Sequence, residues 1–589
     1  MILIFGGTTE GRMAVDVCDK AGSPFIYSTK EGLQDVRMLH GKAASGVMTR
    51  KDIVAVCQAE GVQCIVDASH PFAERLHSTI AEAMEELGLA VIRIQRKFGP
   101  EDRAFVYCDD WDAALKEISN KPATRLLALT GANTIMRLKP YWERHDTFFR
   151  IMRREQSLST ARVAGFPTDR LIYYPDDKAM PTIEDEIAMM RKTGCDTIVT
   201  KESGENGGFG TKTEAAKRLG LRVIVIRHPR LPETWTYVTG PIGLRRAIEQ
   251  AVPTFFAQKT GLTTGTCATA VVKAAVGVMT GVIVDGKEPV DVELPSGESI
   301  PVKIESVRRG DGFAEADIIK DYSDDPDVTR GCRITAHVKW GTGGIRFIRG
   351  EGVGTVTLPG LGIAIGEPAI NPTPREMMSK AIRQMTDRSV DVTLSIENGQ
   401  EIARRTLNTR LGVVGGLSII GSTGVVMPLS DEAFIRSIRR EMEVARALGC
   451  REIGLASGKK GEDALRSSHE HLRVIHYGNF IGEALKAAKE IGFESVIVGI
   501  MIGKAVKLAE GKMDTHSHKN TMNQTFLRDV AKRVCPDYAD KIATIDMARD
   551  LWGVMPATFF DEITRLCHVH CQAEFTPGRV EIKLVCDKD

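Results

Sequence analysis

The chain has 589 residues, which at roughly 150 residues per domain predicts about four compact units. Apolar residues make up 43% of it and charged residues 26%, as in ordinary soluble globular proteins. The formal net charge of +1 gives no overall field that would attract nucleic acid or an anionic membrane, so we expect neither as a partner.

The 12 cysteines are scattered without the spacing of a disulfide framework, and no cationic and then apolar leader precedes them. We therefore expect reduced thiols and a cytoplasmic location. No apolar run approaches the roughly 20 residues that a membrane helix needs. These features together favour a cytoplasmic enzyme.

The first part of the chain alternates between buried strands and helices. Residues 2–5 are apolar, which is typical of a strand buried on both faces of a parallel sheet, and residues 11–20 follow with helical spacing. Further strands are predicted at 64–69, 126–133, 196–204 and 221–226, with helices from Pro71, at 134–138 and at 211–220. This succession predicts an α/β fold of doubly wound parallel sheets, in which ligands bind beyond the carboxyl ends of the strands.

The first predicted strand leads into the glycine-rich loop GGTTEGR, residues 6–12. Glycines allow a tight turn and the close approach of a ligand, and the N–H groups that begin the next helix attract phosphate. The loop therefore predicts a site for the pyrophosphate of a dinucleotide. The alternative is a tight turn without a ligand, because the spacing is G-G-x-x-x-G and not G-x-G-x-x-G. Lys30, after the second strand, suits a 2′-phosphate but does not decide between NADPH and NADH.

Four loops together resemble the precorrin-6A reductase family of cobalamin biosynthesis: MILIFGGTTEGR, VDASHPFA, LTGAN and TKESGENGGFGTKTEAA. The resemblance covers about residues 1–250. It implies two Rossmann-like subdomains, about 1–130 and 131–252, and hydride transfer from NADH or NADPH to a double bond of a tetrapyrrole. The cofactor-binding residues that it implies are Gly6, Gly7, Thr8, Thr9, Glu10, Gly11, Arg12, Thr130, Gly131, Ser203 and Gly204, and the implied substrate contact is Ser69. LTGAN departs from the family's Thr-Gly-Ser-Lys form, which leaves the role of Asn133 open.

His70 and Lys201 each follow a predicted strand and are the candidate catalytic residues, as proton donors or charge stabilisers. The alternatives are a turn residue that packs the helix start for His70 and a solvated loop lysine for Lys201. The implied substrate carries many carboxylates, which arginine binds in forked pairs. The cations available for them, each of which is alternatively an ordinary surface charge, are Arg12, Arg93, Lys97, Arg103, Arg137, Arg150, Arg153 and Arg154.

Residues 253–258 are predicted to be a linker. The sequence after it resembles the beginning of another protein. A Gly/Thr loop leads into an Ala/Val helix within residues 260–275. Alternating segments separated by turn residues then predict antiparallel strands, and the succession of strands and helices returns from about residue 430. The second half, 259–589, is therefore predicted to be mixed α+β with two subdomains.

Four stretches of this half resemble the cobalt-precorrin-5B C(1)-methyltransferase family: TGLTTGTCATAVVKAA, GIAIGEPAINPTPREMM, LGVVGGLSIIGSTGVVMPLS and GKAVKLAEGKMDTHSHKN. The resemblance spans nearly all of 255–589. It departs at Asp514, where we expect Asn. The family implies S-adenosyl-L-methionine as methyl donor, a cobalt-corrinoid as acceptor, and a fold outside the common tetrapyrrole methyltransferase class.

Methyl transfer needs in-line positioning more than acid or base, so few side chains must be reactive. We therefore expect glycine-rich backbone at the methyl donor. The preferred donor loop is Gly415, Gly416, Gly421, Ser422, Thr423 and Gly424, and the second choice is Thr263, Thr264, Gly265 and Thr266. The alternatives are a strand-to-strand turn for the first loop and a helix-capping turn for the second. Asn371 and Arg375 are predicted to bind a substrate carboxylate, unless Arg375 is simply exposed in the first turn of a helix.

Two clusters contain metal-ligand residue types, CHVHC at 567–571 and HSH at 516–518. On a helix Cys567 and Cys571 share a face, whereas His568 and His570 point elsewhere. Without a second distant pair, we predict half-buried cysteines and no protein-bound metal. The cobalt belongs to the substrate.

The two families match consecutive reactions, because methylation yields the compound that the reductase consumes. The sequence therefore predicts a bifunctional enzyme with small-molecule corrinoid substrates, and it leaves homo-oligomer formation open. The rival hypotheses are a nicotinamide-dependent dehydrogenase of another substrate fused to an unknown module, and a corrinoid carrier without chemistry.

Overall fold

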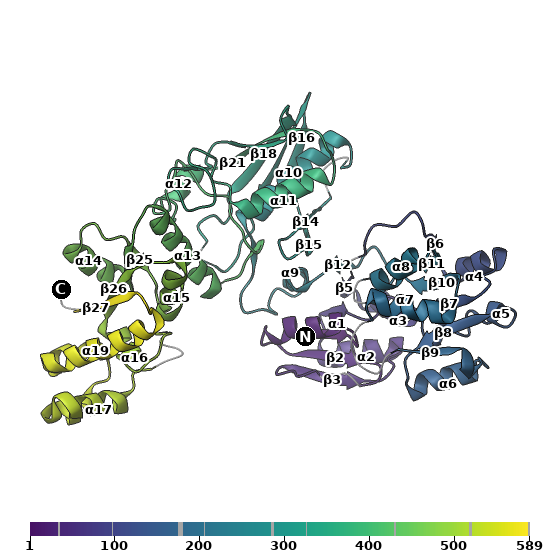
Figure 1. Ribbon diagram of the computed structural model, residues 1–589, viewed down its shortest axis with the longest axis horizontal. Coiled ribbons are helices and arrows are strands. Elements are labelled where there is room, and N and C mark those ends of the chain that lie inside the picture. Colours follow the sequence, from purple (N-terminus) through teal and green to yellow (C-terminus); the bar gives the residue numbers. More distant parts are fainter. Residues whose placement is uncertain are drawn as a thin grey trace. The chain divides into compact units, whose positions relative to one another are not determined.

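The computed structural model describes residues 1–589 except 33–35, 97, 175–180, 205–206, 284–287, 326, 429–430, 517–520 and 587–589. The chain divides into two compact units (Figure 1). The first unit consists of Met1–Ala257 and Glu298–Ile300, and the second of Gln258–Gly297 and Pro301–Asp589.

The first unit contains two six-stranded sheets. One has the order β12-β5-β4-β1-β2-β3 with all neighbours parallel, which is the Rossmann order. Its strands are β1 (Ile2–Phe5), β2 (Phe25–Thr29), β3 (Gly41–Ser45), β4 (Cys64–Asp67), β5 (Ala90–Ile94) and β12 (Thr236–Val238), and its helices are α1 (Thr9–Asp19), α2 (Arg50–Glu60), α3 (Glu74–Leu87) and α9 (Pro241–Ala251). Residues of β1 and β4 are buried on both faces, as their continuous apolar runs predict.

The other sheet of this unit has the order β6-β11-β10-β7-β8-β9, again with all neighbours parallel. Its strands are β6 (Val106–Cys108), β7 (Leu126–Leu129), β8 (Thr147–Ile151), β9 (Leu171–Tyr173), β10 (Thr197–Lys201) and β11 (Arg222–Ile226), and its helices are α4 (Trp111–Asn120), α5 (Lys139–Trp142), α6 (Glu155–Val163), α7 (Ile183–Thr193) and α8 (Phe209–Arg218). The predicted doubly wound α/β fold of the first half is therefore confirmed.

The two sheets exchange one edge strand each. β6 precedes β7 in the chain and forms an edge of the second sheet, whereas β12 follows β11 and forms an edge of the first. The chain thus crosses between the subdomains between Ile94 and Val106 and not near residue 130, and it returns before β12. Because β6 and β12 are only three residues long, their periodicity is too short to show which sheet they join.

Three segments of the first unit differ from their predicted structure. Residues 71–73 form a turn, so α3 begins at Glu74 and not at Pro71, and residues 134–138 form 3-10 and turn structure in place of a helix. Within the predicted linker, Phe255 and Phe256 are buried in the core of the first unit at 4% and 7% exposure.

The first part of the second unit is a mixed sheet with two helices packed against it. β16, β17, β18 and β21 are antiparallel neighbours, as predicted, and β19 is parallel to β21. The small side chains of α10 are buried almost all round, which allows β17, β18 and α11 to approach it closely. The elements are α10 (Thr264–Thr280), β16 (Ser306–Arg309), β17 (Phe313–Ile319), β18 (Arg333–Trp340), β19 (Ile345–Arg349), α11 (Pro372–Arg383), β21 (Val390–Ile396) and α12 (Gly399–Ala403). Two ribbons accompany them, β13 (Gly261–Leu262) with β23 (Val425–Val426) and β20 (Thr355–Val356) with β22 (Val413–Val414). A further ribbon consists of β14 (Val290–Glu293) and β15 (Ser299–Val302), and the first two residues of β15 belong to the first unit.

The second part of this unit is a parallel sheet of order β25-β24-β26-β27. Its strands are β24 (Glu452–Ala456), β25 (Val474–His476), β26 (Ser495–Met501) and β27 (Arg579–Val585), and its helices are α13 (Asp431–Ala447), α14 (Lys459–Ser468), α15 (Ile481–Ile491), α16 (Ile502–Ala509), α17 (Gln524–Val534), α18 (Leu551–Val554) and α19 (Ala557–Glu574). Numbered along the chain, the strand order is 2-1-3-4, as in the flavodoxin-like arrangement.

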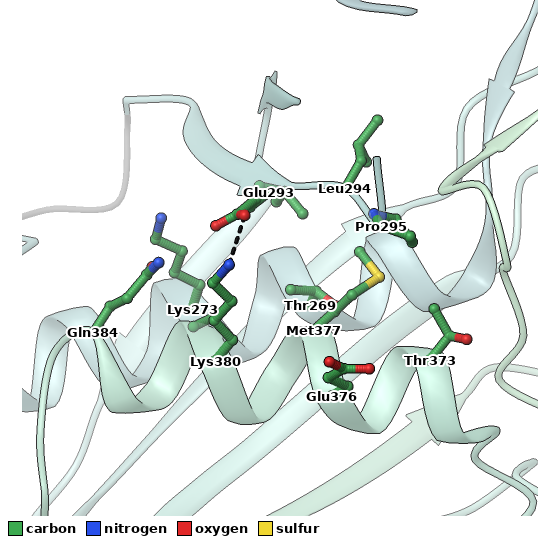
Figure 2. A pocket seen from close by; sticks show the side chains of 12 residues that line it. Thr269, Lys273, Glu293, Leu294, Pro295, Thr373, Glu376, Met377, Lys380 and Gln384 are labelled. Atoms are coloured by element: carbon green, nitrogen blue, oxygen red, sulfur yellow. Dashed lines mark hydrogen bonds and ion pairs between the residues drawn. The ribbon is translucent and has the colours of Figure 1, made fainter. Parts of the chain in front are cut away.

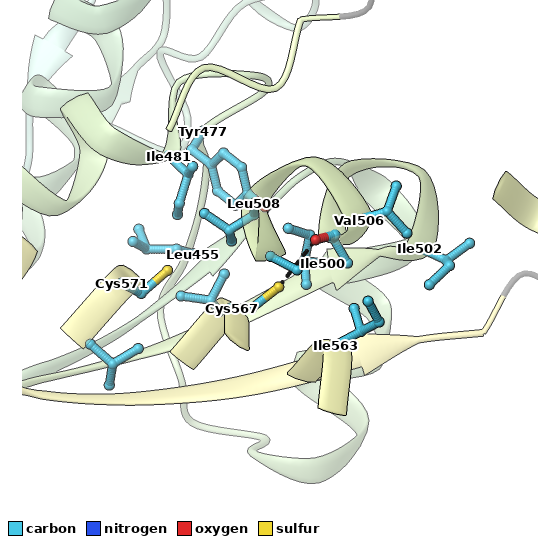
Figure 3. Packing of buried hydrophobic residues seen from close by; sticks show 14 of the residues in the cluster. Leu455, Tyr477, Ile481, Ile500, Ile502, Val506, Leu508, Ile563, Cys567 and Cys571 are labelled. Atoms are coloured by element: carbon cyan, nitrogen blue, oxygen red, sulfur yellow. Dashed lines mark hydrogen bonds between the residues drawn. The ribbon is translucent and has the colours of Figure 1, made fainter. Parts of the chain in front are cut away.

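Cys567 and Cys571 lie on one face of α19, inside the core of this part (Figure 3). Both are 0% exposed, and the Cys567 thiol donates to the Ala505 carbonyl at 3.2 Å. His568 and His570 lie outside this buried face. The shared cysteine face is confirmed, but the thiols are fully buried and not half-buried.

Among the helices in the described part of the chain, none combines the length and the apolar character that crossing a membrane requires.

Candidate active sites

The four loops that carry the first resemblance follow β1, β4, β7 and β10. The strand order of the first six-stranded sheet reverses between β1 and β4, and that of the second reverses between β7 and β10. In open parallel sheets, ligands bind beyond the carboxyl ends of the strands at this position. The loops after β1 and β4 are joined directly, because the Thr8 hydroxyl donates to the Ala68 carbonyl at 2.7 Å.

The glycines of the 6–12 loop have different roles. A Cβ on Gly6 or Gly11 would overlap Tyr27 of β2. The Tyr27 hydroxyl also accepts a hydrogen bond from the Gly7 N–H at 3.0 Å. Gly7 has a φ of +97° and no atom within 4 Å of the position that a Cβ would take. Gly6 and Gly11 thus allow packing against Tyr27, whereas Gly7 leaves its backbone open to a ligand.

The remaining residues of this loop fix its shape. Thr8 caps α1 by accepting the Gly11 N–H at 3.1 Å. Glu10 is buried and accepts two hydrogen bonds of 3.0 Å from Arg96, which also donates to the Ser203 carbonyl at 2.9 Å. Arg96 therefore connects the loop after β1 with the loop after β10. The exposed residues of the loop are Gly7, Thr9 and Arg12.

Ser69 lies in a buried polar network at the end of β4. Its hydroxyl donates to Asp67 at 2.6 Å and lies 3.1 Å from His77 Nε2, and Arg93 pairs with Asp67 at 2.8 Å. Ser69 is 4% exposed, and burial lowers the pKa of His77 to about 4. The network fixes the loop after β4, and the role of Ser69 as a substrate contact stays a prediction.

His70 is neutral at physiological pH. Its Nδ1 accepts the Phe72 N–H at 3.1 Å, so the ring proton of the neutral form is on Nε2. Burial, followed by the positive charges of Arg96 and Lys201, lowers the pKa of His70 to about 4. The residue keeps exposed surface, so this desolvation comes from the protein packed around the ring and not from complete enclosure.

Lys201 ends β10 against two aromatic rings. Its Nζ lies 5.1 Å from the ring centroid of Phe72 and 5.5 Å from that of Trp111. Burial lowers the pKa of Lys201 to about 8, against the opposing charge of Glu74. An ammonium group with this pKa is protonated at pH 7 and readily releases its proton, so Lys201 suits a general acid better than His70 does.

The second sheet contributes a second open glycine turn. Thr130 is buried, and its hydroxyl lies 2.7 Å from that of Thr134. Gly131 has a φ of +82° and no atom within 4 Å of a Cβ position. Ser203 and Gly204 are buried in the loop after β10. The backbones of Gly7 and Gly131 therefore fit the close approach of a dinucleotide.

The predicted carboxylate-binding cations have different environments. Arg93 and Arg150 are buried, and Arg137 pairs with Glu74 at 2.8 Å. Lys97 lies outside the described residues. Exposed positions are held by Arg12, Arg103, Arg153 and Arg154.

In the second unit, three of the sequence motifs meet at the amino ends of α10 and α11. The Ile420 N–H donates to the Thr264 hydroxyl at 2.9 Å, and the Thr266 hydroxyl donates to the Gly424 carbonyl at 2.6 Å. A Cβ on Gly265 would lie 2.7 Å from Pro374 of α11. The two loops that the sequence offers as alternatives for the methyl donor are therefore neighbours.

Most glycines of these two loops are filled by the protein itself. A Cβ on Gly416 would overlap the Gly352 carbonyl, and one on Gly421 would overlap Thr263. Thr263, Thr264 and Thr266 are at most 8% exposed. These glycines thus permit close backbone packing, which is the alternative to ligand binding. The donor-loop residues that keep some exposure are Gly415, Gly421, Ser422 and Thr423.

Asn371 and Arg375 hold the turn before α11. The Asn371 N–H donates to the Ile419 carbonyl at 3.0 Å. The Arg375 guanidinium donates to the carbonyls of Ile370 at 2.9 Å and Pro368 at 3.1 Å. Because these bonds occupy much of the guanidinium, binding of a substrate carboxylate by Arg375 stays a prediction.

A cavity of about 150 Å³ lies along the groove between α10, α11 and β14 (Figure 2). Lys380 pairs with Glu293 across it at 2.6 Å, and Lys273 donates to the Asp291 carbonyl at 2.6 Å. Burial lowers the pKa of Lys273. Ligand sites usually span roughly 300–1,000 Å³, so this cavity accommodates a small group and not a whole macrocycle. Leu294 lines it and also contacts Gly424 of the third motif.

In the described part of the chain, no three His, Cys, Asp or Glu residues are grouped as metal ligands. Burial raises the pKa of Cys571 to about 12, so its thiolate, the form that binds metal, is disfavoured. His518 of the HSH cluster lies outside the described residues.

Sequence reasoning missed Tyr27, Arg96 and Trp111. Tyr27 lies mid-strand, and Arg96 and Trp111 are far in sequence from the residues that they contact. Their only sequence signal is the position of Arg96 just after a strand and of Trp111 at a helix start.

Two family models match the chain. The precorrin-6x reductase CbiJ/CobK model matches residues 1–242, and the CbiD model matches residues 253–428.

Curated relatives align with the second half. A cobalt-precorrin-5B C(1)-methyltransferase of Prosthecochloris aestuarii is 39% identical over 352 residues, which are 56% of this chain and 94% of the relative. Its counterpart in Thermus thermophilus is 44% identical over 276 residues, 46% of this chain and 74% of the relative. Among solved structures, a CobK precorrin-6A reductase is 22% identical, with a TM-score of 0.35, over 43% of this chain and 97% of its own.

Proposed function

The chain belongs to the cobalt-precorrin-5B C(1)-methyltransferase family and carries a precorrin-6x reductase region before it, and from this premise we propose how its two halves divide the chemistry of a bifunctional cobalamin biosynthesis enzyme. The second half methylates cobalt-precorrin-5B at ring carbon 1 and gives cobalt-precorrin-6A. The first half reduces that product to cobalt-precorrin-6B. One chain thus performs two consecutive steps.

In the reductase half, a nicotinamide cofactor supplies the hydride when bound. Gly7 and Gly131 fit its backbone approach, because each leaves open space where a Cβ would stand. Lys201 donates the proton that balances the hydride, and its Nζ–H is the bond that breaks. Neutral His70 orients the substrate through Nε2–H. The observation that carries this assignment is the position of Lys201, whose pKa is about 8. It lies at the loop after β10 and against Phe72 of the loop after β4.

In the methyltransferase half, S-adenosyl-L-methionine supplies the methyl group when bound. The macrocycle lies over the meeting point of the three motifs, where Ile420 is 50% exposed and Ser422 is exposed. The adjoining cavity has two lysines and two glutamates in its lining, Lys273, Lys380, Glu293 and Glu376, so it gives no net positive charge to a carboxylate. The protein's contribution is mainly alignment, which accounts for few reactive side chains at this point.

The test incubates the full chain with cobalt-precorrin-5B and omits one cofactor at a time, following masses. Without nicotinamide cofactor the methylated product should accumulate, and without S-adenosyl-L-methionine nothing should change. Reduction of cobalt-precorrin-5B in the absence of S-adenosyl-L-methionine would contradict the proposed order of steps. A chain that binds the corrinoid and alters it under no condition would be a carrier.

A further inference from the structure

The proposed proton donor Lys201 stands against aromatic rings and not against a carboxylate. Its Nζ contacts the rings of Phe72, in the loop after β4, and Trp111, at the start of α4. Within the described residues this ammonium group forms no ion pair. A largely buried cation is normally paired, because burial alone disfavours its charge. A carboxylate beside Lys201 would therefore strengthen its charged form.

The carboxylate available to Lys201 is that of Glu74, and Arg137 holds it. Glu74 begins α3, whereas Arg137 follows β7 of the other six-stranded sheet. The guanidinium donates to both Glu74 oxygens, at 2.8 Å and 3.5 Å. The side chains of Arg137 and Glu74 are 46% and 39% exposed, and ion pairs that are this exposed contribute little to stability. Another carboxylate can therefore replace Glu74 at the guanidinium.

Arg137 and Lys201 also meet at one ring. Arg137 Cζ lies 5.4 Å and Lys201 Nζ lies 5.5 Å from the ring centroid of Trp111. Two cations at one ring repel each other, and Glu74 is bound by the arginine. The lysine gains this counter-ion only when the arginine receives another anion.

Glu74, Arg137 and Lys212 are the charged residues that act on Lys201 in the described structure. Burial lowers the pKa of Lys201 to about 8; the charge of Glu74 opposes this shift, and the charges of Arg137 and Lys212 add to it. Lys212 is buried in α8 and donates to a backbone carbonyl of the preceding loop at 2.8 Å, which fixes its position. His70, whose pKa is about 4, is neutral beside Lys201. Glu74 is therefore the group whose movement changes the charge state of Lys201.

We propose that Glu74 and Arg137 are positioning residues for Lys201 and form a carboxylate-exchange pair. Arg137 holds the Glu74 carboxylate until a carboxylate of the corrinoid binds the guanidinium, and the released Glu74 then pairs with Lys201 Nζ. No proton moves in this exchange, since one carboxylate replaces another at Arg137. Lys201 thus holds its proton more firmly when the substrate is bound. This inference rests on the proposed reductase function.

The test measures the pKa of Lys201 in the full chain directly, without turnover. Acetic anhydride labels the neutral form of an amine, and mass mapping follows the labelling of Lys201 between about pH 6 and 10.5. The exposed Lys217 is the internal reference. The midpoints of the pH profiles are compared and not the rates, because a ligand that shields Lys201 lowers the rate at every pH.

Glu74→Gln removes the carboxylate and should lower the midpoint of Lys201 by roughly 0.5–1 pH unit, since a nearby negative charge favours the ammonium form. Arg137→Gln releases Glu74 and should raise the midpoint by a similar amount. The matched control is Glu86→Gln, because Glu86 lies on the same helix and also pairs with an arginine, Arg50, at 2.7 Å. This control should leave the midpoint in place. An unshifted midpoint in Glu74→Gln or in Arg137→Gln would overturn the proposal.

The second arm adds cobalt-precorrin-6A without nicotinamide cofactor, and gel filtration shows separately whether it binds. In the unaltered chain the midpoint of Lys201 should rise by roughly 0.5 unit, which keeps it below about pH 9 because it starts from about 8. In Glu74→Gln the midpoint should not move.

The outcomes of this arm separate the inference from the function. A bound corrinoid that leaves the midpoint of the unaltered chain in place, or that raises it equally in Glu74→Gln, would overturn the exchange and leave the reductase function standing. A corrinoid that does not bind to the unaltered chain would overturn the reductase function together with the exchange.

Discussion

At the scale of single residues, we expect Lys201 to determine the pH dependence of the proposed reduction. Its pKa of about 8 means that the ammonium form predominates below that pH. The rate of reduction should therefore be highest below about pH 8 and fall as pH rises through it. The measurement is the pH profile of kcat for the second step. A flat profile between pH 7 and 9.5 would exclude Lys201 as the donor.

Replacing Lys201 with Met should lower kcat for reduction by about 100- to 10,000-fold, the usual contribution of a general acid. Methylated product should accumulate in the coupled assay, while nicotinamide affinity stays near its original value. The matched control is Lys217→Met, because Lys217 is an exposed lysine paired with Asp102. Equal losses in the two variants would assign the effect to surface charge.

Substitutions of Gly7 test whether the 6–12 loop binds the dinucleotide. Gly7→Asp adds a negative charge beside the expected phosphates, and Gly7→Asn adds the same backbone strain at a φ of +97° without the charge. The Asp variant should lose nicotinamide affinity much more than the Asn variant, and methyl transfer should persist in both. Equal affinities measured by fluorescence titration would remove this loop from the cofactor site.

Gly416, unlike Gly7, has no space for a side chain. Because a Cβ there would overlap the Gly352 carbonyl, Gly416→Ala should destabilise the second unit, by about 1–3 kcal/mol as for other overpacked sites. Thermal unfolding checks this, with Gly503→Ala as control, since a Cβ at Gly503 meets nothing within 4 Å. A variant as stable as the control would show that the loop has room for a ligand.

At the scale of elements, α19 contributes its cysteine face to the core and not to a metal site. Burial raises the pKa of Cys571 to about 12 and lies behind the raised pKa of Cys567 as well. Both thiols should therefore stay unmodified by iodoacetamide at pH 8 in the folded protein. Cys586, which is partly exposed, serves as the reactive control. Mass mapping that finds Cys571 modified as fast as Cys586 would contradict this packing.

The elements that sequence predicted best are those with long, consistent patterns. β1 and β4 have apolar runs that are buried on both faces, and α10 is buried almost all round, so the composition of these segments is sufficient to predict that they are buried. The sequence does not assign β6 and β12 to their sheets, because a strand of three residues is too short to show a periodic pattern of apolar residues. The 2-1-3-4 order of the last sheet was not predicted, because strand order depends on pairing between distant segments such as β24 and β26.

The same limits apply to the candidate sites. Local motifs indicated Gly7, His70 and Lys201 as candidate site residues, because strand ends and glycine turns can be recognised from residues adjacent in the sequence. Contacts such as Arg96 with Glu10, or Arg137 with Glu74, join residues distant in sequence and have no local signature. Glycine patterns alone also failed to separate Gly7, which is open, from Gly416, which the backbone fills.

At the scale of the whole molecule, the two units should fold and act separately. Fragment 258–589 should methylate, and fragment 1–257, which contains the first unit except Glu298–Ile300, should reduce. Fragment 1–252 lacks Phe255 and Phe256, which are buried in the first core, so it should melt at a lower temperature than 1–257. Equal melting temperatures would show that these two rings contribute nothing to the first unit.

Joining the halves should raise the effective concentration of the intermediate near the reductase. The full chain should then show a shorter lag before reduced product than an equimolar mixture of the two fragments. The time course of the coupled reaction gives this lag. Equal lags with both fragments active would leave the two activities intact and exclude a benefit from proximity.

The central claim is that one chain carries out both steps on one substrate in a fixed order. Its most direct test supplies the full chain with cobalt-precorrin-5B, methyl-deuterated S-adenosyl-L-methionine and nicotinamide cofactor deuterated at the transferred position, and analyses products by mass over time. The account predicts a product that bears the labelled methyl group first, followed by one that bears both labels. A product that carries the hydride label without the methyl label, or no doubly labelled product, would contradict it.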